Sequence, residues 1–551
     1  MFTSMHGLMM HRPLRIIDIL TFASEAYPAE GIVSAKADGH LHRQTYPQTL
    51  GRAAQLAHAL IAMGIHTGDR VATLAWNGHR HFEIYYAVSG VGAVCHTINP
   101  RLSVDQLVYI INHASDRILF IEPEFSSVIQ QVRDRLPKNL NIILLTDSDD
   151  ISDPLSGTPD YEDLIAPYED HFDWPEFAEE TAAALCYTSG TTGDPKGALY
   201  SHRSTVLHAM MVSISQRTSF VPGQKVLPVV PLFHVNAWGL PYSAPLMGMT
   251  MVMPGPALDG VSLYRLMDRE GVFSSWGVPT VWAGLMQQIK SEGRAPVGLR
   301  DLVVGGSAMP RAMITEYDDW GITVSQCWGM TETSPVGTNG VPTPDLAHVS
   351  PKDRIAAASG AGRRNFGLDF KIVDENGKRL PHDGFQKGEL FVRGNTVISG
   401  YFDNTAATAD AFDREKWFGT GDISSIDPIG RLTIHDRAKD LIKSGGEWIS
   451  SIDLENTASG HPGIANCAVI GIAHPKWDER PVLVAVAAPG ERPDLHMMKE
   501  FLSTSFARWQ LPDDLIYVDS LPMTATGKIS KRTLRQQFAD YVLPDMRQHN
   551  T

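Results

Sequence analysis

The chain has 551 residues, of which 43% are hydrophobic and 20% are charged. That length exceeds what one hydrophobic core supports, so two or more domains are expected. The formal net charge is −15 at pH 7, and the sequence has no cluster of lysine or arginine. A nucleic-acid partner requires a basic face, so these features favour a soluble protein that acts on small molecules.

The cysteines and the apolar stretches bear on the compartment. Cys95, Cys186, Cys327 and Cys467 show neither metal-site spacing nor a disulfide framework, which predicts reduced thiols. The N-terminus lacks the pattern of a secretory signal peptide. The longest stretch poor in charge, 226–258, is interrupted by prolines that a transmembrane helix would not tolerate. We therefore expect buried strands and loops there, no transmembrane segment, and a cytoplasmic protein.

Helices and strands alternate in the N-terminal part of the chain. Apolar residues at helical spacing over 53–61 predict a helix that stops at Gly64, followed by a strand over 70–76. Further predicted elements are a strand at 118–121, a helix at 125–136, a strand at 142–145, a strand at 182–186, a helix at 202–211, a strand at 302–304 and a helix at 311–320. This order is typical of α/β proteins with parallel sheets.

The pattern changes in the last third of the chain. Short alternating strands over 369–434, separated by Gly-containing turns, predict a small β subdomain. Strands at 468–472 and 482–487 and a helix at 495–504 then predict an α+β domain. We expect a large α/β N-terminal domain over 1–436 that includes the β subdomain. A hinge at 437–441 and a small mobile C-terminal domain over 442–551 would follow.

The most informative stretch is 187–197, directly after a predicted strand. Its hydroxyl, glycine and lysine residues are Thr188, Ser189, Gly190, Thr191, Thr192, Gly193 and Lys196. Glycines let backbone N–H groups approach an anion, hydroxyls add donors and lysine adds charge, so the run predicts a phosphate-binding loop. An ordinary turn needs fewer such residues. Because Lys196 precedes Gly197 and no hydroxyl follows, the loop is not a Walker A sequence.

This loop resembles the phosphate loop of the acyl-adenylate-forming superfamily, which includes acyl-CoA synthetases, peptide-synthetase adenylation domains and firefly-type luciferases. The superfamily's other motifs recur in order over about 185–532, so the resemblance covers essentially the whole chain. It implies ATP, Mg²⁺ and coenzyme A as the cofactors. It also implies a small-molecule carboxylic acid as the substrate.

The resemblance assigns nucleotide-binding roles to several residues, each of which alone would more often be structural. Trp328 would pack on adenine, Thr331 would touch the α-phosphate and Glu332 would bind Mg²⁺. Asp422 would accept hydrogen bonds from the ribose hydroxyls, with Arg437 beside it.

Lys528 matches the adenylation lysine, which bridges the substrate carboxylate and the α-phosphate in the superfamily. Lys439 occupies the hinge position, where many relatives have aspartate. The residues that resemble the segment lining the thiol tunnel are Gly445, Gly446, Glu447 and Trp448.

The segment 231–239 resembles an aromatic motif of acyl-CoA synthetases at the acyl pocket and thiol channel. His234 would gate the pantetheine tunnel and Trp238 would form the floor of the acyl site. A hydrogen-bonded core role is the commoner one for such a histidine, and both interpretations stay open. The residues that resemble the glycine strand beside adenine and the acyl chain are Gly305, Gly306 and Ser307, with Gly329 also beside the substrate.

The implied reaction is ATP-dependent acyl-CoA synthesis through an acyl-AMP intermediate. The segment 226–258 contains no carboxylate to pair a substrate ammonium group, which disfavours an amino-acid substrate. The amino-acid sequences of segments such as 95–102 and 444–449 are similar to those of bacterial medium-chain fatty acyl-CoA ligases and of relatives that activate 3-methylmercaptopropionate. An aryl- or cinnamate-type CoA ligase, a luciferase-like oxygenase and a catalytically silent binding protein are the alternatives. Members of the superfamily are often homodimers, so a homodimer is possible, but the sequence identifies no interface.

Overall fold

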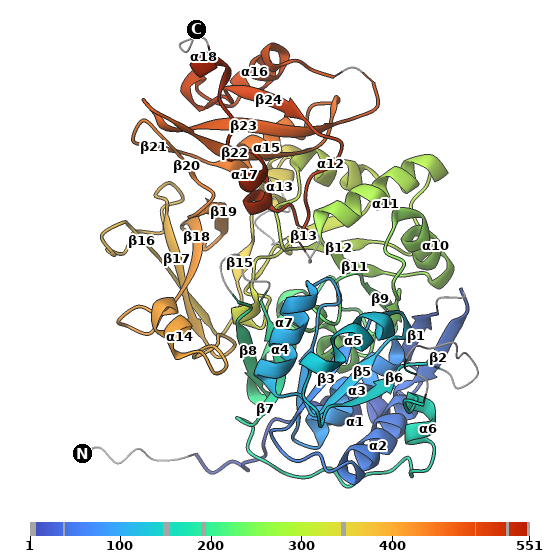
Figure 1. Ribbon diagram of the computed structural model, residues 1–551. Helices are drawn as coiled ribbons and strands as arrows, with labels where there is room; N and C mark the ends of the chain where they lie inside the picture. The colour runs from blue at the N-terminus through green and yellow to red at the C-terminus, as the bar shows by residue number, and fades with distance from the viewer. Residues whose placement is uncertain are drawn as a thin grey trace.

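The structure is a computed structural model that describes residues 7–36, 39–146, 155, 157–188, 194–342, 349–490, 492–524 and 528–547. Two largely parallel sheets form the N-terminal body (Figure 1). The first runs in the order β13-β12-β11-β9-β10-β1-β2, and only β2 is antiparallel to its neighbour. Its strands are β1 (Gly31–Ala35), β2 (Leu41–Thr45), β9 (Lys225–Pro228), β10 (Thr250–Met253), β11 (Ser274–Gly277), β12 (Asp301–Val304) and β13 (Thr323–Gln326).

The second sheet runs in the order β6-β5-β3-β4-β7-β8, and only β8 is antiparallel to its neighbour. Its strands are β3 (Arg70–Leu74), β4 (Val94–Thr97), β5 (Ile118–Ile121), β6 (Asn141–Leu144), β7 (Ala182–Tyr187) and β8 (Gly197–Ser201). The hairpin β7–β8 flanks the predicted phosphate loop. The sequence-based prediction of an α/β body with parallel sheets is confirmed.

Helices cover both sheets. Those of the N-terminal body are α1 (Ile16–Ala26), α2 (Tyr46–Ala62), α3 (His79–Gly90), α4 (Val104–Ala114), α5 (Ser126–Val132), α6 (Tyr161–Ile165), α7 (His202–Ser215), α8 (Val235–Trp238), α9 (Leu240–Leu246), α10 (Gly260–Glu270), α11 (Pro279–Glu292), α12 (Arg311–Asp319) and α13 (Pro351–Ala358). Capping boxes start α2 at Thr45, α4 at Ser103 and α7 at Ser201. Helix α3 is buried at nearly every position and belongs to the largest hydrophobic core, together with α1, α2 and α9.

The expectation of only strands and loops over 226–258 is wrong in one respect, because α8 and α9 lie between β9 and β10. Pro241 falls in the first turn of α9, where a missing N–H group leaves no helical hydrogen bond unmade. Among the described residues, no helix is long and apolar enough to span a bilayer.

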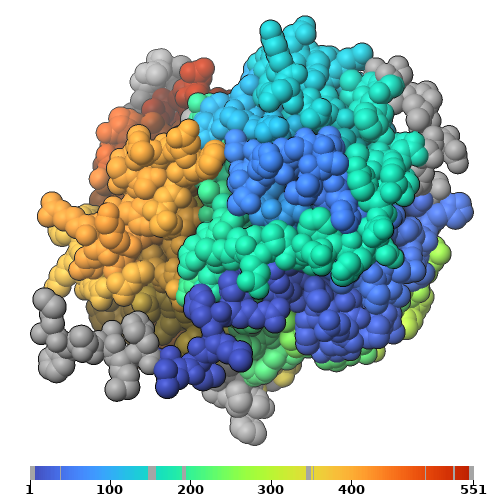
Figure 2. All heavy atoms as spheres, turned by 90° about the horizontal axis from the view of Figure 1, so that it is seen from below, coloured from blue at the N-terminus to red at the C-terminus, as the bar shows by residue number. Residues whose placement is uncertain are grey.

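The β subdomain is an antiparallel sheet of β16 (Leu368–Val373), β17 (Gly388–Gly394), β18 (Phe418–Ile426) and β19 (Leu432–Arg437), with α14 (Thr405–Ala411) beside it. The short strands β14 (Thr338–Asn339) and β15 (Arg363–Arg364) pair separately. In Figure 2 this subdomain, in orange, lies beside the N-terminal segments in blue to green. A bridge between Gly197 and Phe402 joins the two regions.

The C-terminal region contains the sheet β21-β20-β23-β22, with β24 paired to β23. Its elements are β20 (Ile442–Ser444), β21 (Glu447–Ile449), α15 (Ser451–Ala458), β22 (Ile464–His474), β23 (Asp478–Ala487), α16 (Leu495–Ser503), β24 (Asp514–Tyr517), α17 (Lys531–Gln537) and α18 (Pro544–Arg547). This α+β region stands over the N-terminal body in Figure 1. The boundaries at 436 and 442 stay predictions.

Candidate active site

The base of the predicted phosphate loop is well defined. The backbone N–H of Thr188 donates to the carbonyl of Lys196 at 2.8 Å, which extends the β7–β8 pairing. The loop residues Ser189, Gly190, Thr191, Thr192 and Gly193 lie outside the described residues. The Lys196 Nζ lies 5.0 Å from the centre of the Tyr401 ring. A cation therefore stands at the foot of the loop.

Glu332 is buried next to this cation. The hydroxyl of Tyr401 donates to Glu332 Oε1 at 2.7 Å, and burial raises the pKa of Glu332 against this hydrogen bond and the charges of Arg437 and Lys196. The preceding residue, Thr331, is also buried, and its carbonyl accepts a hydrogen bond of 2.5 Å from Tyr200. A carboxylate that is costly to bury unpaired is suited to a divalent cation.

The available side chains fit a Mg²⁺ ion that takes some of its ligands from the protein and the rest from the substrate. The described residues contain no group of three or more His, Cys, Asp or Glu side chains able to enclose a metal ion. Magnesium in nucleotide sites takes one or two protein carboxylates and completes its shell with phosphate oxygens and water. Glu332 would supply that carboxylate.

Three of the predicted nucleotide-binding residues contact one another directly. The indole N–H of Trp328 donates to Asp422 Oδ2 at 2.8 Å, and Arg437 Nε lies 2.9 Å from Asp422 Oδ1. Burial raises the pKa of Asp422, and the charge of Arg437 opposes that effect. A Cβ atom on Gly337 would lie 2.8 Å from the Trp328 ring, so one edge of the indole is packed on backbone. The bond between Trp328 and Asp422 was not predicted.

Lys528 reaches this cluster from the C-terminal region. A Cβ atom on Gly306, whose φ is +81°, would lie 2.9 Å from Lys528 Cε. Burial and the neighbouring charge of Arg437 lower the pKa of Lys528 to about 8, although Asp422 opposes the shift. The N–H of Thr524 donates to the Lys528 carbonyl at 2.6 Å. The predicted adenylation lysine thus lies beside the predicted glycine strand.

The segment with His234 and Trp238 has an unusual backbone. Residues Val235 to Gly239 all have positive φ, and four of them are not glycine. Left-handed helical geometry costs roughly 1–2 kcal/mol per non-glycine residue. Trp238 is packed on Gly305, where an added Cβ would lie 2.8 Å from the indole. Burial and the charge of Lys528 lower the pKa of His234 to about 3, so the imidazole is neutral.

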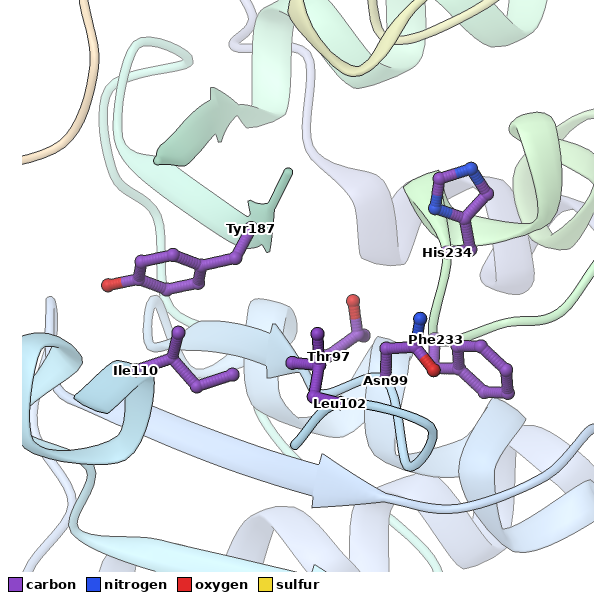
Figure 3. A pocket seen from close by; sticks show the side chains of 7 residues that line it. All are labelled: Thr97, Asn99, Leu102, Ile110, Tyr187, Phe233 and His234. Carbon is purple, nitrogen blue, oxygen red and sulfur yellow. The ribbon is translucent and has the colours of Figure 1, made fainter. Parts of the chain in front are cut away.

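A small pocket lies beside His234 (Figure 3). Its lining residues are Thr97, Asn99, Leu102, Ile110, Tyr187, Phe233 and His234. In the view of Figure 3, Thr97 and Asn99 lie between Tyr187 and His234. The pocket is therefore bounded by the end of β7, by the end of β4 and by the segment that leads into α8. It has both hydroxyl and apolar walls.

The residues assigned to the thiol tunnel lie elsewhere. Gly445, Gly446, Glu447 and Trp448 belong to the β20–β21 hairpin at the edge of the C-terminal sheet, and Trp448 is 46% exposed. The structure does not bring them to Lys528. Lys439 is an exposed residue in the turn between β19 and β20, and partial burial of its amine lowers its pKa. Ser307 is exposed, whereas Gly329 is required by packing because an added Cβ would lie 1.9 Å from the Pro335 carbonyl oxygen.

Sequence reasoning missed two contact residues of the site. The first is Tyr401, whose hydroxyl donates to Glu332 and whose ring contacts the Lys196 ammonium group. The second is Thr420, whose carbonyl accepts a hydrogen bond of 3.0 Å from Arg437. Thr420 lies two residues before Asp422 and could have been found by its position. Tyr401 is 69 residues from Glu332 and has no such signal.

The chain is similar to proteins of a known family. The AMP-binding enzyme family matches residues 23–402, and the AMP-binding enzyme C-terminal domain matches residues 453–528. A 3-methylmercaptopropionyl-CoA ligase of Ruegeria lacuscaerulensis is 45% identical over 97% of this chain and 99% of its own. A medium-chain-fatty-acid–CoA ligase of Ectopseudomonas oleovorans is 45% identical over 98% of each chain.

Solved structures give the same result. A Mycobacterium tuberculosis fatty acyl CoA synthetase is similar with a TM-score of 0.71 and 28% identity, over 96% of this chain and 98% of its own. ATP-bound MatB from Rhodopseudomonas palustris is similar with a TM-score of 0.80 and 25% identity, over 95% of this chain and 99% of its own. The chain therefore belongs to the AMP-binding enzyme family.

Proposed function

We propose that this chain is an AMP-forming acyl-CoA ligase that converts a short- to medium-chain carboxylic acid into its CoA thioester. The observation that carries the proposal is the position of Lys528, a partly buried cation beside Gly306 and close to the Asp422–Arg437 pair. The full-length relatives named as CoA ligases support the same reaction.

In the first step, a carboxylate oxygen of the acid attacks the α-phosphorus of ATP, and the bond from that phosphorus to the bridging oxygen breaks, releasing pyrophosphate. Two anions must approach each other, and Lys528 offsets their repulsion. Glu332 would hold Mg²⁺, which when bound neutralises phosphate charge. Thr331, Lys196 and the 188–193 loop would contact the phosphates. The product is acyl-AMP.

The nucleoside end is held by the Trp328–Asp422–Arg437 cluster. Asp422 already binds both Arg437 and the Trp328 indole, so its two oxygens are fixed in direction before ribose arrives. Pre-organised acceptors lose little conformational entropy on binding. Gly305, Gly306, Ser307 and Gly329 form the wall beside adenine and the acyl group.

In the second step, the CoA sulfur attacks the acyl carbon and AMP leaves. The neutral imidazole of His234 borders the small pocket of Figure 3, in a position suited to gate the pantetheine arm. The hairpin with Gly445, Gly446, Glu447 and Trp448 would have to move to that pocket by rotation about Lys439. The C-terminal domain would thereby bring Lys528 to the active site for adenylation and the hairpin to it for thioester formation.

The acid is proposed to have an apolar tail, because Trp238 forms one wall and the 226–258 segment has no carboxylate. Fatty acids and 3-methylmercaptopropionate both meet this requirement. We also place the enzyme in the cytoplasm, which suits the four unpaired cysteines. A homodimer is proposed because members of the superfamily are often homodimers. Light scattering would test this by measuring the molar mass in solution.

The test is exchange of labelled pyrophosphate into ATP by the purified protein, with Mg²⁺ and acids from acetate to laurate, 3-methylmercaptopropionate or cinnamate. CoA-dependent AMP release would then report the thioester step. Lys528→Ala should abolish exchange yet retain thioester formation from supplied acyl-AMP. Absence of exchange with every acid would refute the proposal, and a preference for cinnamate would make the enzyme an aryl-CoA ligase. Oxygen consumption with light emission would indicate a luciferase-like oxygenase.

A further inference from the structure

We infer that Tyr85 and Asn236 are positioning residues that hold His234 and Trp238 in place, so that the Tyr85 hydroxyl sets the acid chain-length preference. The inference rests on the proposed function, which places Trp238 at the acyl tail and His234 at the thiol. Neither Tyr85 nor Asn236 is one of the residues assigned to substrate contact.

The backbone between His234 and Gly239 needs external support. The φ angles are 49° at Val235, 52° at Asn236, 45° at Ala237 and 57° at Trp238. Among L-residues, only asparagine and aspartate adopt this conformation with any ease, and they do so singly. A run of four persists only where surrounding contacts determine it.

Tyr85 provides the contact at the centre of the turn. Its buried hydroxyl donates to the Leu232 carbonyl at 2.6 Å and lies 3.1 Å from Asn236 Oδ1. The same amide oxygen accepts from Cys186 Sγ at 3.3 Å. Cys186 belongs to β7, the strand that leads into the phosphate loop. The Asn236 side chain therefore ties the turn to α3 and to β7 at once.

The chain on either side of the turn is held by other groups. Asn77 donates to the carbonyls of Pro228 and Val230 at 2.8 and 3.0 Å, and its Oδ1 accepts from the Leu232 N–H at 2.7 Å. Tyr86 donates to the Pro241 carbonyl at 2.7 Å. Of the two adjacent tyrosines, only Tyr85 forms a hydrogen bond with a residue of the turn, Asn236.

The turn determines where two side chains point. His234 precedes it and lines the pocket of Figure 3, whereas Trp238 ends it and packs on Gly305. A relaxed turn would shift the indole relative to Gly305 and change the depth left for the acyl tail. It would leave Asp422 and Arg437, two of the proposed nucleoside contacts, unchanged, because their ion pair and hydrogen bonds do not involve the turn.

Tyr85→Phe and Tyr86→Phe form a matched pair, because both remove one buried hydroxyl that donates to a backbone carbonyl of the same segment. The assay is pyrophosphate exchange with butyrate and octanoate, together with the KM for ATP and the thermal midpoint. Tyr85→Phe should change the octanoate-to-butyrate ratio of kcat/KM by about tenfold, the effect of one lost hydrogen bond. Its KM for ATP should stay the same. Tyr86→Phe should lower the midpoint similarly with the ratio unchanged.

Asn236→Gly and Asn236→Ala provide the second test, which also serves if Tyr85→Phe does not fold. Glycine accepts a φ of 52° without strain, whereas alanine resists it. If the turn conformation governs activity, the glycine variant should keep the wild-type chain-length ratio better than the alanine variant. A role limited to filling space predicts the reverse order, because glycine leaves the larger cavity.

The reverse order, or equal ratios in Tyr85→Phe and Tyr86→Phe, would overturn the inference while the proposed function stands. Wild-type protein that exchanges pyrophosphate with no acid would overturn both. The two failures are therefore distinguishable.

Discussion

The most direct consequence of the geometry is a pH dependence carried by Lys528. Its side chain lies beside Gly306, where desolvation of the ammonium group and the neighbouring charge of Arg437 lower its pKa to about 8. The proposed adenylation step requires this group to be charged. Adenylation should therefore be lost as the pH rises through about 8, in a range where an ordinary lysine with a pKa near 10.4 would stay charged.

The size of the effect follows from the fraction protonated. At pH 9 a group with a pKa of about 8 is protonated in roughly one molecule in ten, compared with roughly nine in ten at pH 7. We expect kcat/KM for ATP to fall about tenfold between these two values, because this constant reports the free enzyme. ATP binding adds negative charge near the amine, so kcat should decline at a higher pH than kcat/KM.

The assay is pyrophosphate exchange at fixed free Mg²⁺ between pH 6 and pH 10. Lys528→Arg is the control, since a guanidinium stays protonated throughout and should remove the alkaline decline even if the overall rate is lower. A decline centred near pH 10 in the wild type would refute the reasoning. The same decline in Lys528→Arg would assign it to another group.

Three further changes test other parts of the molecule. Glu332→Gln should weaken the apparent Mg²⁺ affinity by about 10²-fold in a magnesium titration of exchange, with an unchanged thermal midpoint; equal affinity would remove Glu332 from the metal site. Asp422→Asn should weaken ATP binding about tenfold by calorimetry, because Arg437 loses its charged partner; unaltered binding would contradict the ribose role. Burial raises the pKa of Asp301 to about 6, although hydrogen bonds from two serines oppose the shift. The folded state then binds a proton between about pH 4 and pH 6 that the unfolded state has released, so the free energy of unfolding should fall by about 2 kcal/mol over this range. Asp301→Asn should flatten that slope in urea denaturation, and an identical slope would refute it.

Local patterns explain why much of the fold could be predicted. The apolar run at 118–121 is β5 in the structure, and the segment with helical spacing at 53–61 is part of α2. Both could be predicted because the spacing of apolar residues indicates which face of a short element is buried. Motif order predicted that Trp328 and Asp422 share a site, and their side chains indeed touch. Order along the chain does not give the partner of a single hydrogen bond, so the Trp328–Asp422 contact itself could not be predicted.

The α8 turn shows a different limit. Its residues, Val235, Asn236, Ala237 and Trp238, have no composition that signals positive φ, and two of them disfavour it. The conformation follows from Tyr85 and Asn77, which lie about 150 residues earlier. Tertiary contacts thus override local preference at a place where the proposed substrate is bound, as is common at functional sites.

The contacts across the hinge explain why the structure presents Lys528 rather than the hairpin. Asp436 is buried at the end of β19, and its Oδ2 accepts from both the N–H and the hydroxyl of Ser451 at 2.6 Å. Lys531 donates to the same hydroxyl at 2.6 Å and pairs with Glu455 at 2.8 Å. Lys531 follows Lys528, the proposed adenylation lysine, by three residues, so this network anchors the chain directly after Lys528. The proposed rotation about 437–441 has to separate Asp436 from Ser451, and a buried carboxylate that loses its donors is costly. New contacts of the rotated domain would have to offset that cost for the proposed thioester step.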